Sequence, residues 1–300
     1  MQPILMNASS KISRRNALAR ISAGTFVASL LPMQNLAAAR HSKPGIRIGA
    51  CDWSLGRTAN PEAFDVAREI GLDGVQVSLG TAADNMRMRT TEAQRQVMER
   101  SRKTGVQVAS LAIGELNVVP YKSNPATIPW VEDSIDTCKS MGANVVLLAF
   151  FSKNDLRNDP EGTNEVVKRL QAVAPKAEKH GIILGIESWL SAEQHLQIID
   201  RVGSTAVKVY YDVCNSTDRG YDIFKEIRIL GRDRIFEFHA KENGALLGKG
   251  KVDFNMVRKA MDAIGYSGWI QIEGAVPAGA NLIESYKRNC DFLRKTFALT

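Results

Sequence analysis

The chain has 300 residues and a formal net charge of +7. This length is sufficient for one large hydrophobic core, and no linker rich in proline, serine or glycine divides it, which favours a single α/β domain over two. Beyond an N-terminal segment that carries four of the positive charges, no block of lysine and arginine could follow a phosphate backbone, so we expect no nucleic-acid partner.

Residues 1–39 have the features of an export signal. They combine basic residues without any acidic one, an apolar stretch at 21–31 and small residues at 37–39; the basic residues are Lys11, Arg14, Arg15 and Arg20. Residues 13–18 resemble a twin-arginine signal. The apolar stretch is shorter than the roughly 20 residues that a membrane-spanning helix needs. We therefore expect cleavage after Ala39, export to the periplasm or beyond, and no stable membrane anchor afterwards; an uncleaved amphipathic leader helix is the alternative.

After this segment, short apolar runs alternate with longer amphipathic stretches, which is typical of a parallel sheet with crossover helices. The predicted strands are residues 46–52, 74–79, 106–112, 144–150, 183–189, 207–212, 235–239 and 269–273. The predicted helices are residues 60–70, 91–104, 127–141, 161–180, 191–201, 220–230, 253–264 and 279–297. Residues 117–129 are predicted to form a long loop, either a lid or a passive surface excursion.

Several predicted helices stop at a glycine, which relieves the left-handed turn at a helix end. These glycines are Gly71, Gly105, Gly142, Gly181 and Gly265. Eight strand and helix units of about 33 residues predict a (β/α)8 TIM barrel, a single α/β domain over residues 45–297. A doubly wound open sheet is the alternative. The four cysteines are widely spaced, so we expect buried thiols, with a bridge between Cys51 and Cys214 as the alternative.

Each of the last four predicted strands stops on a potential metal ligand. These residues are Glu187, Asp212, His239 and Glu273. They follow one another at about one strand-plus-helix unit, so they can converge at the C-terminal end of a barrel. Three carboxylates and one imidazole suit Mn²⁺, Mg²⁺ or Co²⁺, with Zn²⁺ as an alternative. The pattern predicts an enzyme with one divalent metal ion.

Side chains alternate along a strand, which places a second set of residues on the inward face one layer below the ligands. This set is Gly185, Tyr210, Glu237 and Gln271. A buried carboxylate at Glu237 needs a partner, and Lys208 is a candidate. Alternatively, Glu237 orients a metal ligand by hydrogen bonding. A register shifted by one residue would turn it toward a helix instead.

Two segments accompany the ordered ligand set: residues 238–242 (Phe-His-Ala-Lys-Glu) and 247–254 (Leu-Gly-Lys-Gly-Lys-Val-Asp-Phe). Together they resemble the xylose-isomerase-like TIM barrel family, also called the sugar phosphate isomerase/epimerase family. The resemblance covers about residues 45–297. It implies that Glu187 and Glu273 are an acid/base pair that moves a proton between adjacent carbons through an enediolate. A metal beside a carbonyl stabilises the developing oxyanion, so that a nearby carboxylate can remove an α-proton.

The chain departs from the ketose epimerases of this family. Those enzymes carry a histidine three residues after the aspartate ligand and an arginine six residues after the histidine ligand, where this chain has Asn215 and Ala245. Glu193, six residues after Glu187, matches one of their substrate-contacting glutamates. The resemblance therefore implies altered substrate recognition.

Other residues are candidates for contact with a sugar. Trp53 and Trp189 can form apolar walls against its ring, or cap the barrel core instead. Lys241, on the same face as His239, can add positive charge near the oxyanion, or remain solvated. With Glu193 and Asn215 they form the predicted substrate-binding set.

A DNA-repair role is excluded by the histidines. Endonuclease IV shares this barrel but needs several histidines for its zinc ions. Apart from His239, the histidines of this chain are His41, His180 and His195, and they fall in the tail or on helices.

We therefore predict a metal-dependent isomerase or epimerase that acts on a sugar or sugar derivative. The sequence is compatible with an oligomeric protein. One alternative uses the same enediolate but expels a substituent, as a lyase or hydratase on keto-sugars or keto-glycosides. The other is an exported carbohydrate-binding protein without turnover.

Overall fold

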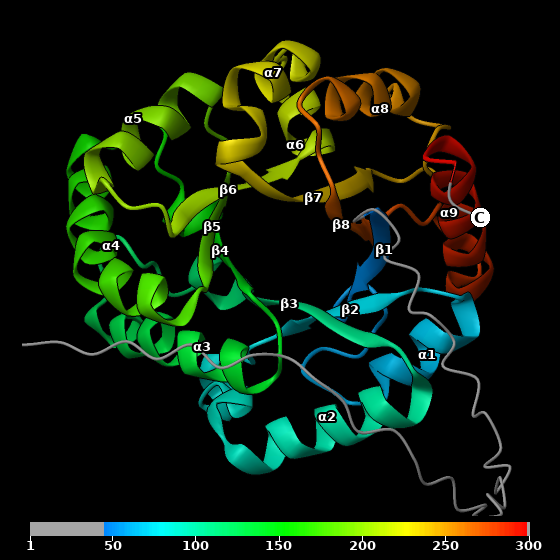
Figure 1. Ribbon diagram of the computed structural model, residues 1–300, viewed down its shortest axis with the longest axis horizontal. Coiled ribbons are helices and arrows are strands. Elements are labelled where there is room, and N and C mark those ends of the chain that lie inside the picture. The colour runs from blue at the N-terminus through cyan, green and yellow to red at the C-terminus, as the bar shows by residue number, and fades with distance from the viewer. Residues whose placement is uncertain (1–44, 299–300) are drawn as a thin grey trace, which may run out of the picture. The chain divides into compact units, whose positions relative to one another are not determined.

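A computed structural model describes residues 45–298, which form a closed barrel of eight parallel strands surrounded by helices (Figure 1). The strands are β1 (Ile46–Cys51), β2 (Gly74–Ser78), β3 (Gln107–Ile113), β4 (Val145–Phe150), β5 (Ile183–Ser188), β6 (Val207–Asp212), β7 (Ile235–Glu242) and β8 (Gly268–Gly274). Each pairs with the next, and β8 pairs with β1 to close the barrel. The predicted (β/α)8 fold is confirmed, and the open sheet is excluded.

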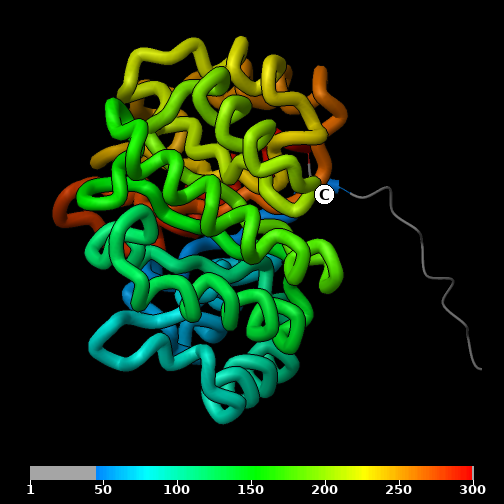
Figure 2. Tube along the Cα trace, turned by 90° about the vertical axis from the view of Figure 1, so that its left-hand side faces the viewer, coloured from blue at the N-terminus to red at the C-terminus, as the bar shows by residue number. Residues whose placement is uncertain are grey.

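One helix follows each strand, except that two, α6 and α7, lie between β6 and β7. They are α1 (Ala63–Ile70), α2 (Thr91–Thr104), α3 (Ile128–Ser140), α4 (Pro160–His180), α5 (Ala192–Val202), α6 (Val213–Asp218), α7 (Ile223–Arg234), α8 (Phe254–Ala263) and α9 (Leu282–Thr296). The last helix packs against the first, and red and blue segments lie side by side in both views (Figure 1, Figure 2). The export signal predicted at residues 1–39 lies outside the described residues and stays a prediction. None of the helices in residues 45–298 is both long and apolar enough to cross a membrane.

At the C-terminal end of the barrel strands, one helix was not predicted and one strand is longer than predicted. The short helix α6 was not predicted. Asp212 is both the last residue of β6 and the N-cap of α6, so no loop residues separate the two elements in the sequence. Strand β7 runs to Glu242, three residues past the predicted end at His239, since Lys241 still pairs with Glu273 of β8.

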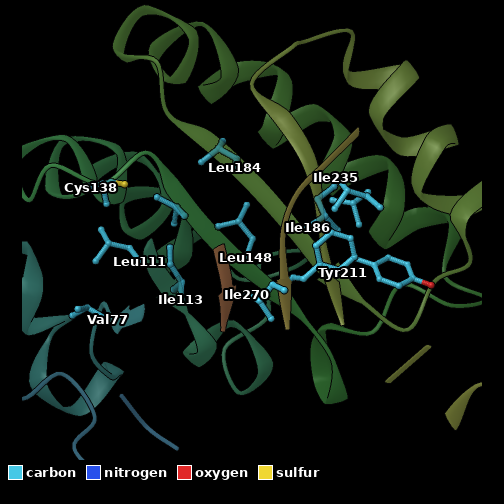
Figure 3. Close-up of a cluster of buried hydrophobic side chains, with 14 of the residues drawn as sticks. Val77, Leu111, Ile113, Cys138, Leu148, Leu184, Ile186, Tyr211, Ile235 and Ile270 are labelled. Carbon is cyan, nitrogen blue, oxygen red and sulfur yellow. The ribbon is translucent and has the colours of Figure 1, made fainter. Parts of the chain in front are cut away.

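The main hydrophobic core lies between the barrel and its helices. Strand side chains such as Leu148, Leu184 and Ile186 project into it together, with Cys138 of α3 at one end of the cluster (Figure 3). A smaller apolar cluster inside the barrel comprises Ala112, Val145, Leu147, Ala149 and Tyr210. All four cysteines are buried and none forms a disulfide. The predicted buried thiols are therefore confirmed, and the alternative disulfide between Cys51 and Cys214 is not formed.

The loop predicted at residues 117–129 is fixed to α4. Tyr121 is buried, and the Arg169 guanidinium donates to the carbonyl oxygens of Tyr121 (2.6 Å) and Asn124 (3.0 Å). These contacts favour the passive alternative over a lid.

The glycine-rich segment after β7 is closed by a buried carboxylate. Glu242 accepts hydrogen bonds from the backbone N–H groups of Lys251 and Val252, both at 3.0 Å. A Cβ atom at Gly250 would overlap this carboxylate, and one at Gly248, whose φ is +73°, would overlap the ring of Phe292. The segment that carries the family resemblance therefore has a structural reason for its glycines.

Replacing Gly250 with alanine should destabilise the fold by about 1–3 kcal/mol, because overpacking would displace a carboxylate that two backbone groups hold. Urea unfolding measures the change. Gly114→Ala is the matched control, since a Cβ there meets no atom within 4 Å and needs no positive φ. Equal stability of the two variants would contradict this role of Gly250.

Candidate metal centre and active site

The four predicted ligands meet at the C-terminal ends of β5 to β8. One donor atom from each of Glu187, Asp212, His239 and Glu273 lies within 4.8 Å of the others. His239 Nδ1 is 2.8 Å from Glu187 Oε1, 3.6 Å from Glu273 Oε2 and 3.9 Å from Asp212 Oδ2. His239 is fully buried and Glu187 and Asp212 are nearly so. Residues far apart in the sequence are thus brought to one point by the barrel.

Asp212 is held by the helix that it caps. Its Oδ1 accepts hydrogen bonds from the backbone N–H groups of Cys214 and Asn215, both at 2.8 Å. This fixes the side chain so that Oδ2 points toward His239, buried and without a hydrogen-bond partner among the described residues. An orphaned carboxylate oxygen in a buried acidic cluster is costly unless a cation satisfies it.

The donor set fits a divalent cation. Three carboxylate oxygens and one imidazole nitrogen are ligands that Mn²⁺, Mg²⁺, Co²⁺ or Zn²⁺ can accept. Burial raises the pKa of Asp212 to about 7, with Glu187 and Glu273 adding to the shift and Lys241 opposing it. Burial also disfavours charge on His239, but Cys51, Glu187 and Glu273 raise its pKa well above the ordinary value. Without a metal, a proton on the imidazole partly balances the acids.

Glu273 is held by two donors at the rim. The indole N–H of Trp53 donates to its Oε1 (3.0 Å), and the ammonium of Lys241 donates to its Oε2 (2.9 Å). Burial disfavours its charge, yet His239 and Lys241 lower its pKa to about 2. Trp53 and Lys241 therefore orient one of the two predicted acid/base residues, and both face the cavity above the ligands.

That cavity has a volume of about 410 Å³, within the usual range for small-molecule sites. Of the predicted site residues, the structure places six on its walls: Trp53, Glu187, Trp189, Asn215, Lys241 and Glu273. The sequence reasoning missed the wall contributed by the first four strands and the segments after them, namely Thr58, Ser78, Gly80, Thr81, Gly114, Glu115, Asn117, Leu147, Ala149 and Phe151. Most of these lie in or beside loops, where no periodic pattern marks them.

Trp189 forms an apolar side of the cavity. The ring of Phe151 meets it edge-on with centroids 5.2 Å apart. The guanidinium carbons of Arg157 and Arg219 lie 4.8 and 5.4 Å from its ring centroid. Aromatic and cationic neighbours therefore hold the indole in place.

Glu193 is not among the residues that line the cavity: it lies exposed in the first turn of α5 and accepts a hydrogen bond from Ser191 Oγ (3.0 Å). Its contact with a substrate stays a prediction. Another prediction from the sequence is corrected. Lys208 does not pair with Glu237: its ammonium lies over the ring of Phe236, 5.6 Å from the centroid, near the opposite end of β6. Glu237 does face inward, so the shifted-register alternative is excluded.

His195 is a buried histidine that does not join the cluster. Its Nδ1 lies 2.9 Å from the carbonyl oxygen of Ser191, and its Nε2 lies 2.9 Å from the hydroxyl of Ser188, the residue after Glu187. Burial lowers its pKa to about 4. The neutral ring therefore connects the end of β5 to the start of α5.

Comparison with known proteins gives a consistent assignment. A model of the xylose isomerase-like TIM barrel family matches residues 64–296. The 2-epi-5-epi-valiolone 7-phosphate 2-epimerase of Actinoplanes sp. is 25% identical over 228 residues, 73% of this chain and 82% of that protein. The D-psicose 3-epimerase of Enterocloster bolteae is 26% identical over 137 residues, 42% of this chain and 45% of that one. The structure of D-psicose 3-epimerase with D-tagatose from Clostridium cellulolyticum H10 shares the fold, with a TM-score of 0.72 and 15% identity over 84% of this chain and 99% of that one.

Addition of Mn²⁺ to metal-free protein should raise its thermal stability, because an ion that binds only the folded state at 100 times its Kd contributes about 2.7 kcal/mol. Differential scanning calorimetry with and without the ion measures this. Asp212→Asn should lose most of the gain while folding normally, since the amide oxygen can still cap α6. An unchanged gain in this variant, or no gain in the wild type, would contradict the predicted site.

His195 should make the protein less stable as the pH falls from about 6.5 to 4. In this window the unfolded chain binds a proton on this residue and the folded chain does not, so unfolding is favoured by up to about 3 kcal/mol at the acid end. Urea unfolding of metal-free protein across the window should show a shallower loss for His195→Gln than for the wild type. Other titrating groups are common to both proteins and cancel in the difference; parallel curves would contradict this assignment.

Proposed function

The chain belongs to the xylose isomerase-like TIM barrel family, and from this premise and the geometry of its site we propose that it is a divalent-metal-dependent epimerase or isomerase of a sugar or sugar derivative. The observation that carries the proposal is the placement of Glu187 and Glu273, which belong to the metal cluster and also face the cavity. The two sequence relatives described above, both epimerases by name, support the same reaction class.

Glu187 and Glu273 are the proposed acid/base pair. They stand at the ends of β5 and β8, with β6 and β7 between them, so a substrate above the cluster is met from two sides. One carboxylate removes the proton from the carbon next to the carbonyl, and the other returns a proton from the opposite side. A bound divalent ion would polarise the carbonyl and stabilise the negative charge that develops on its oxygen.

The surrounding residues hold this pair and the substrate. Trp53 and Lys241 each donate to one oxygen of Glu273, which restricts its orientation and places one positive charge beside the reacting atoms. The apolar faces of Trp189 and Phe151 line the other part of the cavity and can pack against a sugar ring while keeping water away. Asn215, also on the wall, stands where ketose epimerases carry a histidine, so its hydrogen bonding to the substrate differs from theirs.

Incubating the metal-loaded protein with a panel of keto-sugars and keto-glycosides in D₂O should place deuterium on the carbon next to the carbonyl. Glu187→Gln and Glu273→Gln should each slow this exchange by about 10²–10⁴-fold, since neither amide can accept the proton. Proton NMR follows the exchange, and elemental analysis of each variant at saturating Mn²⁺ separates lost proton transfer from lost metal.

Glu161→Gln, an exposed residue in the first turn of α4, is the matched control and should exchange normally. Retained exchange in both site variants would refute their assignment. Release of water or of a fragment would identify a lyase or hydratase instead. No exchange across the panel, with metal bound, would favour a carbohydrate-binding protein.

A further inference from the structure

The cavity has a second polar wall on the side away from the candidate metal cluster. It is formed by the short 3-10 helix η3 (Gly114–Asn117) that follows β3, and both Glu115 and Asn117 line the cavity. Strands β3 and β7 are four strands apart in a closed barrel of eight and lie on opposite sides of it (Figure 1). The wall after β3 therefore faces the end of β7, which carries His239. A substrate whose carbonyl lies at the cluster turns its far end toward η3.

In each of the two side chains, the protein itself engages one polar atom. Glu115 Oε1 accepts a hydrogen bond from the backbone N–H of Ala82 (3.1 Å), and no hydrogen bond within residues 45–298 involves its Oε2. Asn117 Oδ1 accepts from the backbone N–H of Phe151 (2.8 Å). Because a backbone N–H can only donate, this contact fixes which end of the amide is the oxygen. A ligand can therefore meet an acceptor on Glu115 and the NH₂ donor of Asn117.

The same contacts hold η3 in place from both sides. Ala82 lies in the segment after β2, and Phe151 directly follows β4, so two neighbouring loops restrain the polar pair. The ring of Phe151 also lines the cavity, next to Trp189. Aromatic rings beside a fixed donor and acceptor suit a sugar, which presents apolar C–H faces and hydroxyl groups together. Little ordering of the protein is then needed on binding.

The charge of this wall discriminates between polar groups on the substrate. A phosphate or carboxylate would bring negative charge and further acceptors against the carboxylate of Glu115. Lys241 is the only cation on the part of the cavity wall formed by residues 45–298, and Glu273 already pairs with it at 2.9 Å. An ammonium group can donate to Glu115 but cannot accept from Asn117, whereas a hydroxyl does both.

We propose that Glu115 and Asn117 form a subsite for a hydroxyl group at the end of the sugar remote from its carbonyl, so that the substrate is an uncharged sugar without a phosphate. This inference rests on the proposed function and names its substrate class. Glu115 and Asn117 are then the residues that determine specificity at this end of the cavity. The proposed class differs from the phosphorylated compound in the name of the Actinoplanes relative.

Ketohexoses changed at one position test the subsite. The probes are D-fructose, D-tagatose and D-psicose, each compared with its 6-deoxy and 6-phosphate forms. For Mn²⁺-loaded wild type, loss of the hydroxyl should weaken binding by about 10–100-fold, the effect of losing a hydrogen bond to a charged group. The phosphate should weaken it by about 100-fold or more, since like charges then face each other. Isothermal titration gives the Kd, and deuterium exchange in D₂O gives kcat/KM for the same sugars.

Glu115→Gln and Asn117→Asp separate the two halves of the subsite. In the first, the amide oxygen can still accept from Ala82, but the charge and the free acceptor are lost. In the second, the carboxylate can still accept from Phe151, but the donor is lost. Each should weaken binding of the ketohexoses by about 10–100-fold and leave binding of the 6-deoxy forms unchanged. The 6-phosphates should bind better to Glu115→Gln than to wild type, and no better to Asn117→Asp.

The controls separate contact with the sugar from a structural role. Glu161→Gln, which changes an exposed carboxylate on α4, should keep all wild-type values. Mn²⁺ affinity and thermal unfolding of both subsite variants should match the wild type, because Glu115 and Asn117 lie outside the metal cluster. An equal loss for the ketohexoses and their 6-deoxy forms would indicate a structural role and overturn the inference.

Two further results would contradict the subsite while leaving the proposed function intact. One is unchanged discrimination among the three forms in Glu115→Gln. The other is a wild-type preference for the 6-phosphates, which would direct attention to the guanidinium groups of Arg157 and Arg219 beside Trp189. Binding with the expected discrimination but without deuterium exchange would overturn the proposed function and support the subsite. No binding of any ketohexose would overturn the subsite.

Discussion

The structure depends on the balance of charge around one buried imidazole. Three carboxylates meet His239 where the last four strands end, and acids so close together cannot all stay ionised in a protein interior without a positive partner. A proton on His239 supplies part of that charge, and a divalent cation can supply more. Each acid is also restrained separately: α6 holds Asp212, Trp53 and Lys241 hold Glu273, and His239 itself contacts Glu187.

The barrel can hold this charge because its stability comes mainly from another layer. The large apolar core lies between the strands and the helices, and its burial supplies the main favourable free energy of folding. The inside of the barrel is therefore free to carry Gln76, Ser110, Glu237 and Gln271, whose hydrogen bonds offset part of the cost of burying them.

The sequence predicted the strands and the convergence of the four candidate ligands because each signal is local. An apolar run followed by Glu187 or His239 marks both a strand and a polar side chain near its C-terminal end, and the barrel then brings these side chains together. Contacts between distant elements leave no such pattern. Parity alone made Lys208 a partner for Glu237, whereas the partners, Ser110 and Gln271, come from β3 and β8. Glu193 was assigned by its spacing from Glu187, and it lies exposed in the first turn of α5 rather than on the cavity wall.

The two halves of the barrel contribute different parts of the site, which explains why the candidate metal centre is easier to recognise from the sequence than the substrate is. Strands β5 to β8 supply all four candidate ligands, which lie at or near the strand ends. Much of the rest of the cavity wall comes from loops after β1 to β3, where Thr58, Thr81 and Glu115 lie. Loops change length and residues at little cost to the core, whereas a ligand at a strand end cannot move without losing the ion. Under the proposed function, the proton-transfer step can therefore stay the same while the sugar that is bound changes. Glu115, a carboxylate on the cavity wall outside the candidate metal cluster, is the kind of residue through which substrate choice would change.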